Sequence, residues 1–211
     1  MTRVLLDGRF LPVTRTVGFI DAPLDRCAGP FARIVAGRLS VDPAVLVRRL
    51  VPGPLEQALA ELMPPRDGPS GDRFLLAPTE SSWTAFFENA ADGGDPRPVA
   101  GAVPDELGCR TVTAYIVAGD DGGWDILGFT LAAPGRAGPL DAVRVLILHR
   151  QDGGYEVQSY GEPLAAEEGD PAELDLGRLD RILRSLGIRA FDADFYLPPR
   201  TEGLLVERRA R

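Results

Sequence analysis

Four polar side chains that could take part in acid–base chemistry follow the aromatic stretch Trp83–Phe87. They are Glu88, Asn89, Asp92 and Asp95. Carboxylates on a loop at the end of a strand could exchange protons with a substrate or form a polar recognition site. The same residue types are also common in the turns that end strands, and we favour this second interpretation.

A second acidic pattern is Phe-Asp-Ala-Asp-Phe-Tyr at residues 191–196. In an extended strand Asp192 and Asp194 would share one face and could contact a divalent cation. Two carboxylates alone are too few ligands to hold such an ion, so we predict no metal site here. We expect the aromatic side chains of this hexapeptide to dock the tail onto a sheet.

The residue counts exclude several classes of catalyst. All 23 basic residues are arginine, which excludes a Schiff-base lysine, a pyridoxal-phosphate anchor, a phosphate-loop lysine and a kinase lysine. The single histidine, His149, excludes a multi-histidine metal site, and it could serve Ser159 or Cys109 as a base only if the fold brought them together. Cys27 and Cys109 form no Cys-x-x-Cys motif. We therefore predict no cofactor.

Charge and hydropathy narrow the set of partners. The formal net charge of −8 repels nucleic-acid phosphates, and no dense basic stripe offsets it, so we expect no nucleic-acid binding. An acidic surface suits a basic protein partner, although acidity also serves solubility alone. No apolar run approaches the ~18 residues of a membrane span, so we expect no membrane insertion. Two cysteines without a signal segment favour the cytoplasm.

The spacing of hydrophobic residues predicts helices near both ends of the chain and most of the strands between them. The predicted helices are 21–35, 41–50, 54–63, 95–107 and 176–186, with Gly29-Pro30 expected to kink or divide the first. The predicted strands are 16–20, 73–77, 82–87, 111–118, 124–132, 143–150, 155–160 and, as an edge strand, 202–211. Asp-Gly-Gly within the connectors 119–123 and 151–154 favours tight turns, so these strands form two hairpins.

The element order predicts a single α+β domain over residues 1–211, with a central antiparallel sheet and helices mainly on one side. A helical N-terminal part covers about 21–63, a sheet part about 72–160, and a C-terminal helix and tail about 174–211. Aromatics on both faces of the strand before Glu88 indicate that it is central, so we expect Trp83 and Phe87 to be buried. Glu88 is expected to be a solvated strand-end carboxylate whose replacement by glutamine hardly changes stability.

Four short motifs resemble a family of uncharacterised bacterial proteins. They are Trp-Thr-Ala-Phe-Phe-Glu-Asn at 83–89, Gly-Asp at 94–95, Leu-Gly-Cys-Arg at 107–110 and the hexapeptide at 191–196. The resemblance covers about residues 16–196 and implies an α+β fold, but it assigns no catalytic residue. In class the chain is also similar to bacterial immunity proteins, including the SMI1/KNR4-like type.

These observations favour a non-enzymatic binding protein of the immunity or antitoxin kind, which masks a basic protein partner. The candidate binding residues are Glu88, Asn89, Asp92, Asp95, Asp192 and Asp194. One alternative is a hydrolase or transferase that uses Glu88, Asp92 and Asp95 with an arginine such as Arg110 or Arg144. Another is an accessory subunit of a bacterial assembly, which would show an exposed apolar patch or an unpaired strand edge.

Overall fold

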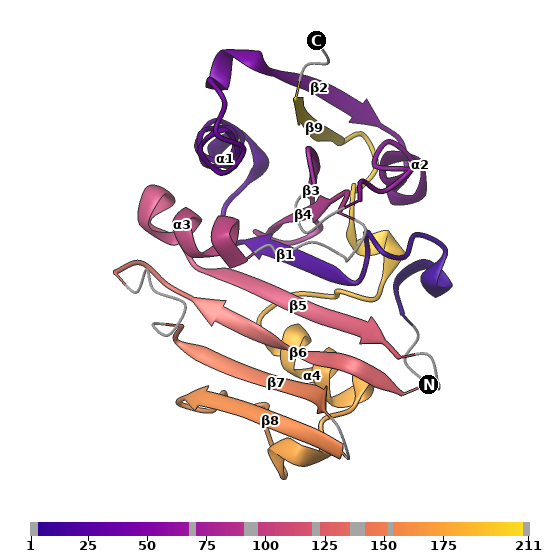
Figure 1. Cartoon of the computed structure of the whole chain (residues 1–211), viewed down its shortest axis with the longest axis vertical. Coiled ribbons are helices and arrows are strands. Elements are labelled where there is room, and N and C mark those ends of the chain that lie inside the picture. The colour runs from indigo at the N-terminus through magenta and orange to yellow at the C-terminus, as the bar shows by residue number, and fades with distance from the viewer. Residues whose placement is uncertain are drawn as a thin grey trace.

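A nine-stranded antiparallel sheet runs through the computed structural model (Figure 1). The model describes residues 4–67, 71–90, 97–119, 123–135, 142–151 and 154–208. Within them the sheet order is β2-β9-β3-β4-β1-β5-β6-β7-β8. The strands are β1 (Thr16–Ile20), β2 (Leu46–Pro52), β3 (Arg73–Pro78), β4 (Thr84–Glu88), β5 (Thr111–Ala118), β6 (Trp124–Ala132), β7 (Arg144–Gln151), β8 (Gly154–Gly161) and β9 (Glu202–Arg208). The α+β class with an antiparallel sheet is therefore confirmed.

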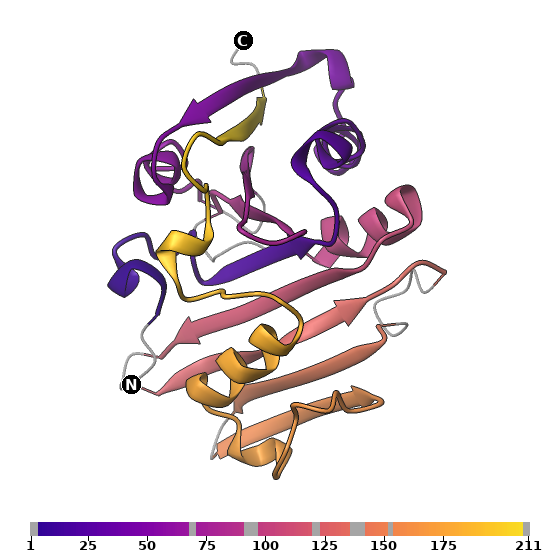
Figure 2. The same ribbon diagram turned by 180° about the vertical axis from the view of Figure 1, so that it is seen from behind.

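Helices cover both faces of this sheet. Helices α1 (Leu24–Arg38) and α3 (Arg97–Leu107) pack on one face, and α2 (Leu55–Ala60) and α4 (Leu176–Ser185) pack on the other. Figure 2 shows α4 crossing β6 and β7 on the face opposite to α1 and α3. The sequence predicts helices mainly on one side of the sheet, whereas the structure has helices on both sides. The first helix continues through Gly29-Pro30 without dividing.

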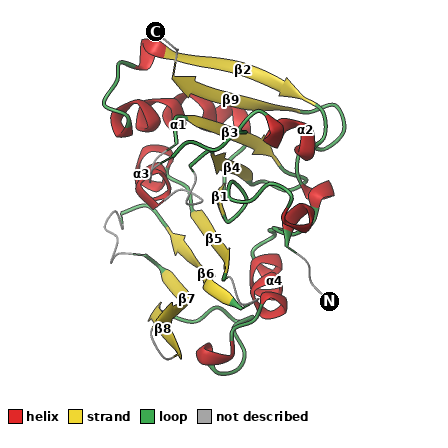
Figure 3. Ribbon diagram, turned by 45° about the vertical axis from the view of Figure 1, so that its right-hand side comes forward, coloured by secondary structure: helices red, strands yellow, loops and turns green. Residues whose placement is uncertain are grey.

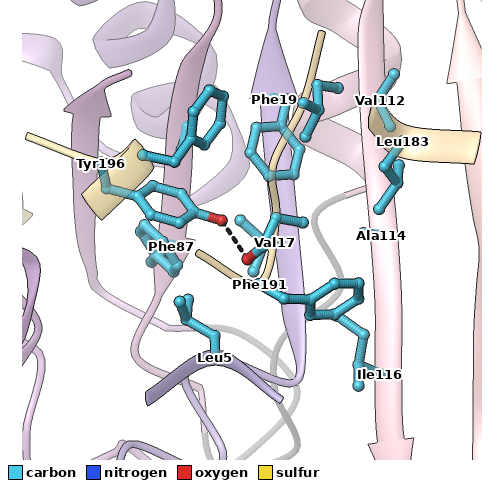
Figure 4. Close-up of a cluster of buried hydrophobic side chains, with 14 of the residues drawn as sticks. Leu5, Val17, Phe19, Phe87, Val112, Ala114, Ile116, Leu183, Phe191 and Tyr196 are labelled. Atoms are coloured by element: carbon cyan, nitrogen blue, oxygen red, sulfur yellow. Dashed lines mark hydrogen bonds between the residues drawn. The ribbon is translucent and has the colours of Figure 1, made fainter. Parts of the chain in front are cut away.

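Strand β4 is buried on both of its faces, as its aromatic residues predict. Phe87 joins one hydrophobic core together with Trp83, and Phe86 points into the other core on the opposite face. Trp83 is 3% exposed and its indole N–H donates to the Leu186 carbonyl at 2.9 Å. Figure 4 shows Phe87 beside Tyr196 in the first core, with ring centroids 5.6 Å apart. The predicted burial of Trp83 and Phe87 is confirmed.

The predicted helix over 41–50 is wrong. Asp42 caps a short 3-10 turn (η2, Pro43–Val45) by accepting the Ala44 N–H, and the chain then continues as β2. Strand β2 pairs along its whole length with β9, from Leu46↔Arg208 to Pro52↔Glu202. This pairing supplies backbone hydrogen bonds from a segment at least 150 positions away, which local spacing cannot reveal. It also makes β9 an internal strand instead of the predicted edge strand.

The two predicted hairpins are confirmed as antiparallel pairs. Strand β5 pairs with β6, and β7 pairs with β8 over eight residues. The turn positions 120–122 and 152–153 lie outside the described residues. Helices α3 and α4 also lie where the sequence predicts them, whereas α2 is shorter than the predicted 54–63. None of the helices within the described ranges combines the length and the apolar character needed to cross a membrane.

Candidate functional site

Glu88 is part of the folded core and not a solvated strand-end carboxylate. Its side chain is 3% exposed and forms a two-point ion pair with Arg38 of α1, with both N···O distances 2.9 Å. The Gly71 N–H also donates to Glu88 Oε1 at 2.5 Å. The Arg38 guanidinium lies 5.9 Å from the ring centre of Phe74. Glu88 therefore joins α1 and the start of β3 to the end of β4, and the expectation that it contacts water is wrong.

Asn89 has a similar structural role and is completely buried. Its Oδ1 accepts the backbone N–H groups of Asp72 and Arg73, each at 2.9 Å, and its Nδ2 donates to Asp72 Oδ1 at 3.2 Å. An amide supplies both the acceptor and the donor that this position needs. Neither Glu88 nor Asn89 is available to a ligand. The other two candidates of this segment, Asp92 and Asp95, lie outside the described residues.

The tail residues Asp192 and Asp194 do not share a strand face. The chain turns there into a short 3-10 segment (η4, Ala193–Phe195), which directs the two carboxylates to different surroundings. Asp192 accepts two hydrogen bonds of 3.0 Å from Arg184 and lies 3.9 Å from Arg189. Asp194 is exposed and lines a cavity. The expected docking of the tail aromatics is confirmed, since Phe191, Phe195 and Tyr196 are all buried.

The cavity beside Asp194 has a volume of about 630 Å³. Its wall is formed mainly by the segment 193–201, with further residues from the start of α2 and from the N-terminal turn (η1, Leu5–Gly8). Two backbone hydrogen bonds attach this segment to the β3–β4 connection: Leu197 N–H to Pro78 O at 2.8 Å, and Glu80 N–H to Phe195 O at 2.9 Å. We call this space the Asp194 cavity.

Three non-glycine residues of the cavity lining have a left-handed backbone. The φ angles are 53° at Leu6, 51° at Leu197 and 69° at Arg200. Such angles are uncommon outside glycine, and they persist only where the surrounding structure holds them in place. The cavity wall is therefore shaped by fixed, unfavourable backbone geometry. No spacing rule identifies these residues from the sequence.

The cavity combines an apolar floor with charged groups. Leu55, Leu197 and the Pro198-Pro199 pair supply apolar surface. Glu56 is paired with Arg9 at 2.5 Å, and Glu80 is paired with Arg189.

Asp194 and Arg200 are the remaining charged residues that line the cavity. Within the described part of the chain, neither of these two side chains has an ion-pair or hydrogen-bond partner. Among the predicted site residues that the structure describes, Asp194 is thus the one left open to a ligand.

The hydroxyl groups at this cavity are already engaged. Tyr196 Oη donates to the Ala190 carbonyl at 2.7 Å, the bond drawn as a dashed line in Figure 4, and burial raises the pKa of this phenol well above its usual value. Thr201 Oγ1 donates to the Pro198 carbonyl at 2.7 Å. Both hydrogen bonds therefore help to hold the wall of the cavity in place.

The arginines that the alternative hydrolase would need are also paired elsewhere. Arg110 binds Asp21 at 2.7 Å, while Arg144 binds the Glu167 carboxylate in a pair whose two side chains are each 2% exposed. His149 faces Ile126 and Glu156 across the neighbouring strands.

Ser159 lies opposite Leu146 and accepts a hydrogen bond from Arg144. The structure therefore brings neither Arg110 nor Arg144 to Glu88.

Neither a metal centre nor a related protein indicates what the site does. Among the described residues, no group of three or more histidine, cysteine or acidic side chains could hold a metal ion. The chain matches no family model, and no curated protein or solved structure matches it.

Proposed function

We propose that this protein is a non-enzymatic binding protein that receives a basic side chain of a protein partner in the Asp194 cavity. The observation that carries the proposal is the contrast between Asp194 and the other acidic candidates that the structure describes. Glu88 and Asp192 are paired with arginines of the fold. Asp194 lines a cavity and has no ion-pair partner in the described ranges.

The chemistry of the cavity supports a protein segment as its ligand. A guanidinium or ammonium group can pair with Asp194, and the stem of such a side chain can pack on Leu197 and the neighbouring prolines. The net charge of −8 would increase the rate of encounter with a basic protein. A rigid wall loses little entropy when a partner binds.

A masking role of the immunity or antitoxin kind agrees with this chemistry, because such a protein needs a complementary surface and no reacting group. Cys27 and Cys109 are both free thiols, which supports a reducing compartment, and we propose the cytoplasm of a bacterial cell. Nucleic acid is not part of the proposal, since phosphates would be repelled by the same charge that attracts a basic protein.

Affinity capture with matched variants tests this proposal. The wild-type protein, Asp194→Asn and Glu106→Gln are each used to capture proteins from a lysate of the source cells. Glu106→Gln removes one carboxylate from α3, on the opposite face of the sheet, so the two variants have the same net charge. We expect a basic protein that binds wild type and Glu106→Gln but binds Asp194→Asn about ten-fold more weakly, equivalent to ~1.4 kcal/mol.

Two results would contradict the proposal. Equal weakening by Asp194→Asn and Glu106→Gln would show that only the overall charge matters. Retention of full affinity by Asp194→Asn would show that the partner binds elsewhere on the molecule. The melting temperatures of both variants must match wild type for either comparison to count.

A further inference from the structure

The two edge strands of the sheet differ in how they are protected. Strands β2 and β8 end the sheet on opposite sides, as Figure 3 shows at the upper and lower ends of the molecule. Strand β2 presents Arg48 and Arg49 as exposed charges and ends at Pro52. Charges and proline are the usual protection of an edge strand against pairing with another chain. Strand β2 is therefore a protected edge.

Strand β8 lacks this protection. It pairs with β7 at eight consecutive positions without a register shift, and it contains no proline and one charged residue, Glu156. Its backbone hydrogen bonds lead to β7, and no other described element bonds to its outer side. Tyr155 and Tyr160 are 48% and 58% exposed. Tyrosine is enriched in protein interfaces, so β8 has the backbone and the side chains of a pairing edge.

The surroundings of β8 are acidic. Exposed carboxylates occur on the strand and along the segment that follows it: Glu156, Glu162, Glu168, Asp170 and Glu173. The short helix η3 (Pro171–Glu173) contacts both β7 and β8, which holds this segment beside the strand.

Two basic residues that contact this segment are buried and do not reach the surface. Arg144 is buried with Glu167, and Arg178 is buried and donates to the carbonyls of Gly169 and Asp170.

We propose that the outer edge of β8 binds an extended, arginine- or lysine-rich segment of another protein as a tenth strand of the sheet. Main-chain hydrogen bonds would supply affinity, and the carboxylates would select a basic segment. A second copy of this chain fits less well, because it would bring the same net charge of −8 and the same exposed carboxylates to this edge. The inference rests on the proposed function only for the class of partner, a basic protein, and it uses a surface separate from the Asp194 cavity.

Peptide binding measured by fluorescence anisotropy tests this inference. The probe is a labelled ten-residue peptide of alternating valine and arginine. One control peptide has glutamate in place of arginine, and a second keeps the arginines but has every backbone N–H methylated. The second control preserves the charge and removes the hydrogen bonds that a new strand would make.

Two proline variants, Val157→Pro and Gln158→Pro, block the edge. Neighbouring residues of an antiparallel strand direct their N–H groups alternately toward the partner strand and away from it. One of the two variants therefore removes an outward N–H and keeps the β7 pairing, and its unchanged melting temperature identifies it. The corresponding variants of β2, Arg49→Pro and Leu50→Pro, act as controls on the protected edge.

We expect the valine–arginine peptide to bind wild type and to bind the correctly folded β8 proline variant at least ten-fold more weakly. The glutamate and N-methylated peptides should not bind, and Asp194→Asn and the folded β2 variant should bind like wild type. No binding to wild type, or equal binding of the N-methylated peptide, would overturn the proposal.

Loss of peptide binding in Asp194→Asn alone would also overturn it, but would leave the proposed function in place. A dimer in sedimentation that the β8 proline variant abolishes would assign the edge to a second copy instead.

Discussion

We predict that removing one partner of the buried ion pair between Arg38 and Glu88 strongly destabilises the fold. Arg38→Ala removes the guanidinium that pairs with the buried Glu88 carboxylate, while the Gly71 N–H still donates to this carboxylate. The Glu88 and Arg38 side chains are 3% and 11% exposed, so water can replace the guanidinium only after the structure rearranges. A buried charge that loses its partner destabilises a protein strongly.

The expected loss in the free energy of unfolding is about 3–5 kcal/mol. A chain of 211 residues unfolds with an entropy of ~0.44 kcal/mol/K, so this loss lowers the melting temperature by about 7–11 °C. Glu88→Gln keeps a neutral acceptor for one of the hydrogen bonds and should cost about 2 kcal/mol. Both losses exceed the near-zero effect that the sequence alone predicted for Glu88.

Urea denaturation followed by circular dichroism measures these losses, and the same helix provides the control. Arg33 of α1 also pairs with a single carboxylate, that of Glu106, but the two side chains are 57% and 37% exposed. After allowance for solvent screening, Arg33→Ala should cost no more than about 1 kcal/mol. If Arg38→Ala costs no more than Arg33→Ala, the buried ion pair does not have the role that we assign to it.

Three further predictions concern the two cores. Trp83→Ala removes a buried indole and its hydrogen bond to the Leu186 carbonyl. Chemical denaturation should show a loss of about 3–5 kcal/mol in the free energy of unfolding, and near-wild-type stability would contradict the packing of Trp83. Gly18→Ala would place a methyl carbon 2.0 Å from the Phe86 ring. We therefore expect a loss of about 1–3 kcal/mol in the free energy of unfolding in the same assay, and an unchanged denaturation midpoint would be inconsistent with this contact. Burial raises the pKa of the Cys27 thiol from 9.0 to about 12, so the unfolded chain releases this proton first. As the pH rises from 9 toward 12, the free energy of unfolding of wild type should therefore fall relative to that of Cys27→Ala. A difference that does not change with pH would contradict the raised pKa of the Cys27 thiol in the folded state.

Local spacing predicted most strands because burial on one or both faces of a strand leaves a direct pattern in the sequence. The β5–β6 and β7–β8 hairpins depend on neighbouring segments, so their turns and alternation suffice to identify them. The β2–β9 pair joins segments that are at least 150 positions apart in the sequence. An amphipathic stretch such as 46–52 fits a helix equally well until its partner is known.

The candidate site was less predictable for the same reason. Nothing near Glu88 in the sequence shows that Arg38, fifty positions earlier, neutralises it. Similarly, Asp192 and Asp194 look equivalent in a strand. Only the turn of η4 separates Asp192, which is paired with Arg184, from Asp194, which has no ion-pair partner among the described residues. The sequence therefore includes Asp194 among the candidates, but it does not show that Glu88 and Asp192 are paired with arginines and that Asp194 is not.

A nuclear magnetic resonance titration tests the central claim most directly, namely that the Asp194 cavity receives a basic side chain. Isotope-labelled protein is titrated with N-acetyl-arginine amide, and with N-acetyl-glutamine amide as an uncharged control. We predict saturable shifts of the backbone amide signals of the non-proline residues in 193–201 and 53–56 with the arginine compound alone, and their loss in Asp194→Asn. Shifts scattered over the acidic surface, or the same shifts in Asp194→Asn, would contradict the claim.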